Sequence, residues 1–190
     1  MTIIIGISGS LRRQSFNSAL LNAAAGLVPA DTELRIRPIG EIPLYNFDIE
    51  AGHGLPASVT QLKNDIAGSD GLLICTPEYN NSIPGVLKNV IDWLSRPPDD
   101  IPRVFGGLPV AIAGASPGRF GTILAQSAWL PVLRTLGANH WSGGRLMVPA
   151  AGRIFDAQGA LLDDGIRDRL ERFVHGFSAF AAGSRPRAPS

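Results

Sequence analysis

The sequence alternates short, almost continuously apolar runs with longer segments whose apolar residues recur at helical spacing. The runs cover residues 3–8, 71–75 and 108–113. A run of this length without polar alternation is typical of a strand buried on both faces, as strands of parallel sheets are. Strands that alternate with amphipathic helices favour one architecture. We predict an α/β, doubly wound parallel sheet with right-handed crossovers and helices on both faces.

The remaining elements complete a pattern of five strands and five helices. A second strand is expected at 33–39, where apolar and charged residues alternate as at a sheet edge, and a short fifth strand near 145–148. Helices are expected after Ser15, between Pro56 and Gly68, and over 86–94, 122–136 and 164–182. Strand order 2-1-3-4-5, the flavodoxin-like order, would put the two most polar loops on either side of the switch point.

The length and composition favour a single domain. The chain has 190 residues, of which 45% are hydrophobic and 17% charged, so one core of ordinary size is expected. We assign residues 1–183 to that domain and 184–190 to a flexible tail. Residues 40–54 have no clear period and are predicted to run over the surface as a possible wall of the site, and 149–159 are predicted to be a loop.

The charge balance and the cysteine content exclude several classes of function. There are 17 Lys and Arg against 16 Asp and Glu, so no global field favours nucleic acid or an anionic membrane. The single cysteine cannot form an internal disulfide, which fits the cytoplasm. The three histidines have no metal-ligand spacing, and we predict no metal site.

A polar, turn-rich stretch, residues 76–85, follows the apolar run 71–75 directly and is called the ring loop below. Ligands of open parallel sheets bind at the carboxyl ends of strands, where this loop lies. Backbone groups of Pro77, Glu78, Tyr79 and Asn80, with the Asn80 amide, offer donors and acceptors to the edge of a flat heterocycle. Tyr79 is expected to flank or stack on that ring, or else to be packed half-buried. The Glu78 carboxylate is expected to be solvated or salt-bridged, with only its backbone facing the ligand.

A second polar stretch, residues 10–17, follows the first strand and is called the phosphate loop below. It combines hydroxyl, amide and guanidinium groups with the N-terminus of a helix, which binds anions through free N–H groups. It lacks the lysine of a Walker loop and the three glycines of a dinucleotide fingerprint. A monophosphate site is therefore one reading, and a capped surface helix with two solvated arginines is the other.

Three stretches closely resemble the NADPH-dependent FMN reductase family, in particular its bacterial chromate and quinone reductases. They are GSLRRQSFN at 9–17, TPEYNNSIPGVLKNVIDW at 76–93 and GASPG at 114–118. The resemblance implies non-covalent FMN in a flavodoxin-like fold, reduced by NADPH or NADH and reoxidised by quinones, chromate, azo dyes or free flavin. The cofactor-binding residues that it implies are Ser10, Leu11, Arg12, Arg13, Gln14, Ser15, Phe16, Asn17, Pro77, Glu78, Tyr79, Asn80 and Ser116.

The implied chemistry is carried by the flavin, so no side chain is expected to act as a nucleophile. Cys75 lies in a buried strand and is predicted to be an inert hydrophobe. We expect ping-pong turnover, in which NAD(P)H passes a hydride to flavin N5 across about 3 to 3.5 Å and then leaves before the acceptor binds.

Other points stay open at this stage. The alternative class is a flavodoxin-like one-electron carrier without an NAD(P)H site, although the balanced charge disfavours the acidic surface of such carriers; a nucleotide-binding regulator is a third reading. The chain departs from the family pattern after Gly118, and Arg119 is a candidate contact for the phosphates of NAD(P)H. The resemblance also implies a homodimer or homotetramer, with Trp93 and Trp129 either near an interface or packed in the core.

Overall fold

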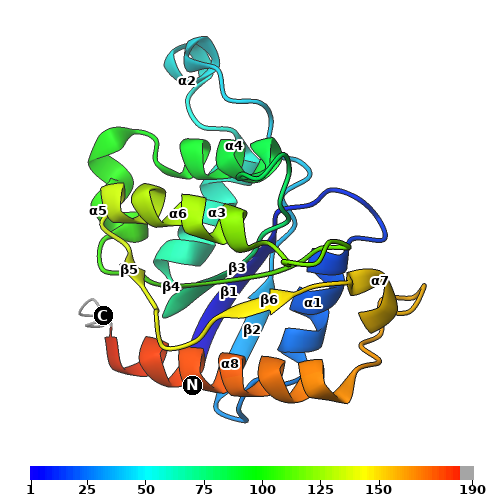
Figure 1. Cartoon of the computed structure of the whole chain (residues 1–190). Helices are drawn as coiled ribbons and strands as arrows, with labels where there is room; N and C mark the ends of the chain where they lie inside the picture. Colours follow the sequence, from blue (N-terminus) through cyan, green and yellow to red (C-terminus); the bar gives the residue numbers. More distant parts are fainter. Residues whose placement is uncertain (185–190) are drawn as a thin grey trace.

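A computed structural model describes residues 1–184, and its centre is a parallel sheet (Figure 1). The strand order is β2-β1-β3-β4-β5, with β6 also paired to β4, and every pairing is parallel. The flavodoxin-like order 2-1-3-4-5 is therefore confirmed. The strands are β1 Thr2–Ser8, β2 Thr32–Ile36, β3 Gly71–Cys75, β4 Pro109–Ala115, β5 Asn139–His140 and β6 Leu146–Val148.

Helices cover both faces of the sheet, as predicted (Figure 1). On one face, α1 and α8 pack with α7, and on the other face α3, α4, α5 and α6 pack together. The helices are α1 Phe16–Ala25, α2 Phe47–His53, α3 Ala57–Ala67, α4 Gly85–Leu94, α5 Ile101–Phe105, α6 Ile123–Thr135, α7 Ala151–Ile154 and α8 Asp164–Ser184, with a 3-10 turn at Pro98–Asp100.

The sheet divides the apolar core into two halves. Leu73 and Cys75 face the α1 and α8 layer, whereas Leu72 and Ile74 face the α3 to α6 layer. All residues of β3 and β4 are buried, because successive side chains enter opposite halves. The reading of these runs as strands buried on both faces is confirmed.

The fifth position of the sheet differs from the prediction. It is occupied by two short strands, β5 and β6; the N–H of Trp141 still donates to the carbonyl of Val110 in β4, and residues 142–145 leave the ladder. The sequence predicted only the second of these strands, because two residues of β5 are too few to show a period. The sheet is thus six-stranded, although it has five positions.

Three short helices also lie where we predicted irregular structure. Within 40–54, Asn46 caps α2 by accepting a hydrogen bond from the N–H of Asp48, and Gly54 ends the helix with φ of 75°. None of the residues of α2 is buried, so the helix carries no amphipathic pattern that a sequence could reveal. Helices α5 and α7 have five and four residues, which are too few to show a helical period in the sequence.

Residues 40–54, called the arm, project beyond the helix layers but are tied to α4 (Figure 1). The side-chain amide of Asn89 accepts from the N–H of Tyr45 and donates to the carbonyl of Pro43, both at 2.8 Å. The indole N–H of Trp93 donates to the same carbonyl at 2.8 Å. The arm is therefore held in place while Leu44 and Phe47 remain exposed.

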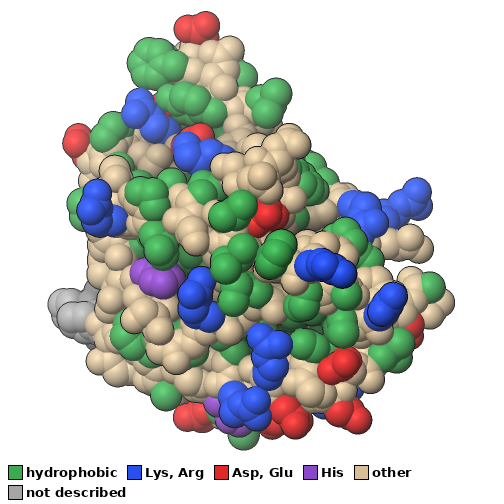
Figure 2. All heavy atoms as spheres, in the orientation of Figure 1, with side chains coloured by type: hydrophobic (Ala, Val, Ile, Leu, Met, Phe, Trp, Pro, Cys, Tyr) green, Lys and Arg blue, Asp and Glu red, His purple; other side chains and the backbone are tan. Residues whose placement is uncertain are grey.

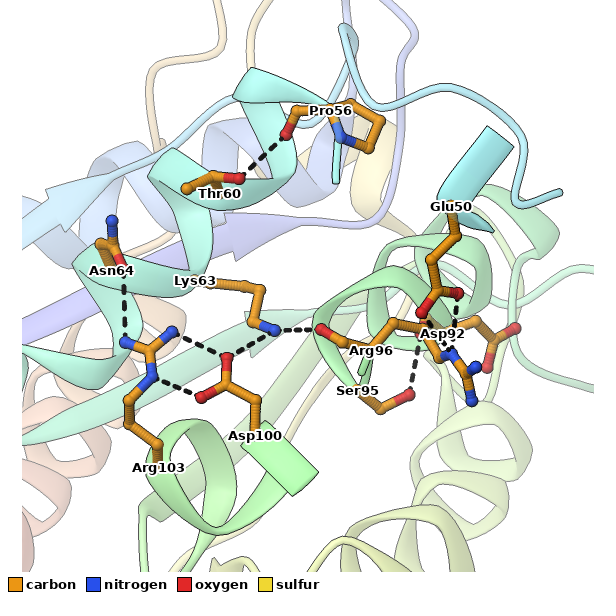
Figure 3. A network of polar contacts seen from close by, with 10 residues as sticks. All are labelled: Glu50, Pro56, Thr60, Lys63, Asn64, Asp92, Ser95, Arg96, Asp100 and Arg103. Atoms are coloured by element: carbon orange, nitrogen blue, oxygen red, sulfur yellow. Dashed lines mark hydrogen bonds and ion pairs between the residues drawn. The ribbon is translucent and has the colours of Figure 1, made fainter. Parts of the chain in front are cut away.

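A polar network continues from the arm into the protein interior (Figure 3). Glu50 forms an ion pair with Arg96 at 2.9 Å, and the backbone carbonyl of Arg96 accepts a hydrogen bond from Lys63. Lys63 is 1% exposed and pairs with Asp100 at 2.7 Å. Asp100 also binds Arg103, and these two cations hold the pKa of the Asp100 carboxyl well below its usual range.

The last helix is longer than predicted. It reaches Ser184, which we had assigned to the tail, and buries Ile166, Leu170, Phe173, Val174 and Phe177 as expected. The rest of the predicted tail, residues 185–190, lies outside the described residues.

Candidate functional site

The phosphate loop and the ring loop lie side by side at the carboxyl edge of the sheet. The N–H of Gly9 donates to the carbonyl of Cys75 at 2.9 Å, which joins the two loops at their start. A Cβ at Gly9 would lie 2.7 Å from Leu87 and 2.9 Å from Pro77, so only glycine permits this approach. The structure thus brings together the two stretches that the sequence singled out.

The phosphate loop ends in a capped helix with free donors. Ser15 is the N-cap of α1, and its hydroxyl accepts from the N–H of Ser18 at 3.2 Å. Within residues 1–184, the backbone N–H groups of Gln14, Phe16 and Asn17 have no hydrogen-bond partner. These donors and the positive end of the helix dipole are what a phosphate requires.

The side chains of this loop are mostly exposed. Leu11, Arg12, Arg13 and Gln14 face solvent, whereas Ser10 and Phe16 are half-buried. The Arg12 guanidinium lies over the Phe16 ring at 4.9 Å from its centroid. Phe16 in turn stacks on Phe155 with centroids 6.3 Å apart, so it anchors the loop to the core.

Asn17 has a different role from its neighbours. Its side chain is 3% exposed and forms two hydrogen bonds with the backbone of Ala115, one donated and one accepted, both at 2.9 Å. The side-chain amide therefore fastens the start of α1 to the end of β4, and only the backbone N–H is left for a ligand. The sequence reading did not include this link, because the partner lies 98 residues away.

The ring loop is built on a tight hairpin turn. Tyr79 and Ser82 exchange both backbone hydrogen bonds, at 3.2 and 3.1 Å. Asn80 and Asn81 between them have φ of 50° and 61°, the left-handed pair that a two-residue type I′ turn requires and that asparagine tolerates. The turn leaves Tyr79 50% exposed, which agrees both with a place beside a bound ring and with half-buried packing.

The carboxylate of Glu78 is partly exposed and forms no ion pair within residues 1–184, but it has a structural role that the sequence did not predict. It accepts hydrogen bonds from the N–H groups of Leu124 at 2.8 Å and Ala125 at 3.0 Å, in the first turn of α6. A carboxylate there satisfies two orphan donors and complements the helix dipole. Glu78 therefore couples the ring loop to α6, while its own N–H has no partner within residues 1–184.

Three residues that the sequence reading missed support the ring loop from below. The Thr76 hydroxyl donates to the Pro77 carbonyl at 2.9 Å and accepts from the Trp129 indole at 3.2 Å. A Cβ at Gly114 would lie 2.4 Å from the Thr76 carbonyl oxygen. A threonine at the end of a buried strand was the only available signal, because Trp129 and Gly114 reach it only in the folded chain.

Cys75 is buried beneath the loop, as predicted. Burial raises the pKa of its thiol to about 12, so the thiol stays uncharged at neutral pH. A group in this state is a poor nucleophile, which agrees with the reading of Cys75 as an inert hydrophobe.

The third predicted segment closes the site on the β4 side. Ser116 is half-buried, its N–H donates to Val148 at 3.0 Å, and its hydroxyl donates to the Gly121 carbonyl at 2.6 Å. Arg119 is exposed on the same segment, beside the exposed Phe120. Ser116 keeps acceptor capacity toward the site, and Arg119 is available to a ligand.

Two hollows flank the phosphate loop. One of about 340 Å³ lies between residues 12–16 and the turn 156–159, and another of about 360 Å³ lies between residues 10–12 and 36–40. Neither hollow contains a residue of the ring loop. Both hollows therefore lie on the phosphate-loop side of the site.

The donors present fit FMN. Unpartnered N–H groups at the start of α1, with nearby hydroxyl and guanidinium groups, match a monophosphate; backbone donors of the ring loop match the polar edge of a flavin. The fold and the site together define a flavodoxin-like protein of the FMN-binding class.

Comparison with known proteins identifies the family. Residues 2–153 match the NADPH-dependent FMN reductase family. An NAD(P)H-dependent FMN reductase of Pseudomonas aeruginosa is 47% identical over 169 residues, covering 89% of each chain. A 2-hydroxy-1,4-benzoquinone reductase of Burkholderia sp. is 39% identical over 179 residues, covering 94% of this chain and 96% of the relative.

A solved structure also resembles this chain closely. The flavoenzyme NAD(P)H:(acceptor) oxidoreductase FerB of Paracoccus denitrificans superposes with a TM-score of 0.86 at 33% identity, covering 97% of this chain and 99% of that chain. The protein belongs to the NADPH-dependent FMN reductase family. It is an oxidoreductase with FMN as cofactor and NAD(P)H as electron donor, which favours the enzyme over the one-electron carrier.

Residues 1–184 contain no group of three or more His, Cys, Asp or Glu side chains placed to hold a metal ion. None of their helices combines the length and the apolar character needed to cross a membrane.

Proposed function

We propose that the protein transfers electrons from NAD(P)H through FMN to quinones. A 2-hydroxy-1,4-benzoquinone reductase and a quinone reductase of Escherichia coli are among its relatives. Chromate, azo dyes and free flavin are further acceptors in this proposal. FMN, when bound, supplies reversible two-electron redox chemistry, and the protein supplies binding and orientation.

The phosphate loop holds the ribityl phosphate in this proposal. The supporting observation is the row of unpartnered N–H groups at the start of α1, beside the hydroxyls of Ser10 and Ser15. Arg12 and Arg13 lie at the rim and supply positive charge, and Leu11 and Phe16 shape the loop. Anion binding at a helix N-terminus is favourable in both hydrogen bonding and electrostatics.

The ring loop holds the polar edge of the isoalloxazine. Backbone N–H groups of Glu78 and Asn80 have no partner within residues 1–184, so they can donate to ring oxygen and nitrogen atoms. Donors at that edge stabilise negative charge on a reduced ring. Tyr79 lies beside the ring, Pro77 supports it, and Ser116 contacts its far side.

Ping-pong turnover is part of this proposal. If NAD(P)H and the acceptor must use the same surface, the oxidised nicotinamide leaves before the acceptor enters. No side chain of the protein acts as a nucleophile or a general acid in this scheme. Arg119 contacts the phosphates of NAD(P)H at the border of the site.

The proposal also covers organisation and location. Residues 1–183 form one domain, and the protein assembles as a homodimer or homotetramer. Trp93 and Trp129 are fully buried, so an interface would use exposed apolar residues such as Leu44, Phe47, Phe120 or Leu124. A cytoplasmic location agrees with the single, buried thiol.

Steady-state kinetics test the mechanism. Initial rates are measured with varied NADPH at several fixed concentrations of 1,4-benzoquinone. Parallel lines in the double-reciprocal plot support ping-pong turnover, and intersecting lines contradict it. Absence of NADPH oxidation with any quinone by the FMN-loaded protein would contradict the acceptor assignment.

A further inference from the structure

The interrupted fifth position of the sheet contains two adjoining hollows. One of about 440 Å³ lies between α6 and residues 140–145, and one of about 330 Å³ lies between residues 141–145 and α8. Both are lined by Gly144 and Arg145, so they meet at that point. No residue of the phosphate loop or the ring loop lines either hollow.

The charges that line these hollows have one sign. Arg145, Arg169 and Arg172 contribute to the lining, and no Asp or Glu does. Within residues 1–184 none of these three arginines takes part in an ion pair, whereas Arg96 and Arg103 near the arm are both paired. Figure 2 shows Lys and Arg side chains spread over this face and acidic side chains mainly along its lower border. The side chains that line the hollows therefore carry only positive charge, and the acidic residues of α8 lie outside the lining.

The indole of Trp141 packs residues 142–145 against α8. Trp141 is half-exposed and packs edge-on against Phe173, with centroids 5.1 Å apart. A Cβ at Gly143, Gly144 or Gly176 would lie 2.5, 2.7 or 2.9 Å from atoms of the indole, respectively. These glycines let the backbone close around Trp141, whose own N–H donates to the carbonyl of Val110 at 2.8 Å. Residues 142–145 are therefore positioned against Trp141 although they leave the ladder.

We propose that these hollows form a second ligand site, which binds a nucleoside di- or triphosphate. Guanidinium groups pair with phosphate oxygens in a planar, bidentate way, and here three of them border one depression. Leu130 and the Trp141 indole offer apolar surface to a base, and Ser142 and His140 offer polar groups to a sugar. Hollows of this size hold small molecules, whereas docked macromolecules need broader, flatter surfaces.

The test uses the FMN-loaded protein and ADP as the probe. Binding is followed by titration calorimetry and by tryptophan fluorescence, since Trp93 and Trp129 are fully buried and Trp141 is not. We expect ADP to bind and adenosine to bind far more weakly. Arg145→Ala and Arg172→Ala should each weaken ADP binding by about tenfold, because each removes a charge-assisted hydrogen bond. Trp141→Phe should remove the fluorescence change.

Arg134→Ala is the matched control, because Arg134 is an exposed arginine of α6 that lines neither hollow. It should leave ADP binding unchanged. The proposal is overturned if ADP gives no heat at millimolar concentration, if adenosine binds as tightly as ADP, or if Arg134→Ala weakens binding as much as Arg145→Ala. ADP binding that saturating NADP⁺ abolishes and that Arg145→Ala leaves intact would place the ligand at the nicotinamide site and also overturn it.

Discussion

The phosphate loop and the ring loop lie next to each other but are stabilised in opposite ways. In the phosphate loop most side chains are exposed and several backbone donors are free. In the ring loop two polar side chains already have protein partners: Thr76 binds Trp129, and Glu78 caps α6. The phosphate loop thus keeps most of its side chains free, whereas the ring loop uses two of its side chains as supports and leaves Tyr79, Asn80 and Asn81 exposed.

This difference changes how charged residues at the site are interpreted. Glu78 lies in the most conspicuous motif of the chain, yet its carboxylate acts on a helix 46 residues away rather than on a ligand. The Ser15 hydroxyl accepts one hydrogen bond, from the N–H of Ser18, and we propose that its proton is donated to a phosphate. Proximity to a cofactor therefore does not by itself assign a side chain to catalysis.

The largest effect is expected where the ring loop rests on β4. Gly114→Ala would place a Cβ 2.0 Å from the Thr122 hydroxyl oxygen and 2.4 Å from the Thr76 carbonyl oxygen. We expect a loss of about 3 kcal/mol in the free energy of unfolding, since overpacked sites cost this much. Urea denaturation measures it. Gly85→Ala, in the ring loop with nothing within 4 Å of the added Cβ, is the control and should be nearly neutral.

Removal of the Glu78 carboxylate should have the next largest effect. Glu78→Ala leaves two N–H groups of α6 without partners, and we expect a loss of about 2 kcal/mol. Glu78→Gln retains an acceptor but no charge and should lose about half as much. Thermal unfolding of the parent protein, Glu78→Gln and Glu78→Ala measures whether stability falls in that order. Equal stability of Glu78→Ala and the parent protein would contradict the capping role.

Two substitutions of Ser15 separate helix capping from phosphate binding. Ser15→Ala should cost about 1 kcal/mol of stability and weaken FMN binding about tenfold, because the hydroxyl serves both roles. Ser15→Asp preserves the cap, so stability should be retained, but its charge repels the phosphate, so the affinity for FMN should fall to that for riboflavin or below. If Ser15→Asp bound FMN normally, the phosphate would not lie at this loop.

The smallest effect is expected at Cys75, between the two loops. Cys75→Ala should change the stability at pH 7 by less than about 1 kcal/mol and leave turnover unchanged. Because burial raises the thiol pKa to about 12, its contribution to stability is complete below the unfolded pKa and declines as pH rises toward 12. Cys75→Ala should therefore flatten the alkaline limb of stability against pH. Rapid alkylation of Cys75 in the native protein at pH 8 would contradict its inertness.

Patterns within the sequence predicted the strand order and the positions of both loops, because burial on two faces leaves uninterrupted apolar runs such as 71–75. Contacts between distant segments escaped prediction. Asn17 and Glu78 were read as ligand groups or free charges, since nothing local indicates Ala115 or the α6 N-terminus. Helix α2 was missed because it buries no side chain, and β5 because two residues show no period.

The most direct test of the division of roles between the loops is to measure how tightly the apoprotein binds FMN and riboflavin. The two ligands differ only in the phosphate group, which riboflavin lacks. The parent protein should bind FMN at least about tenfold more tightly, through charge-assisted hydrogen bonds. Ser15→Asp should abolish that preference while riboflavin affinity is retained, and Glu78→Ala should weaken both ligands equally. A preference for FMN that survives Ser15→Asp, or that Glu78→Ala removes, would contradict the account.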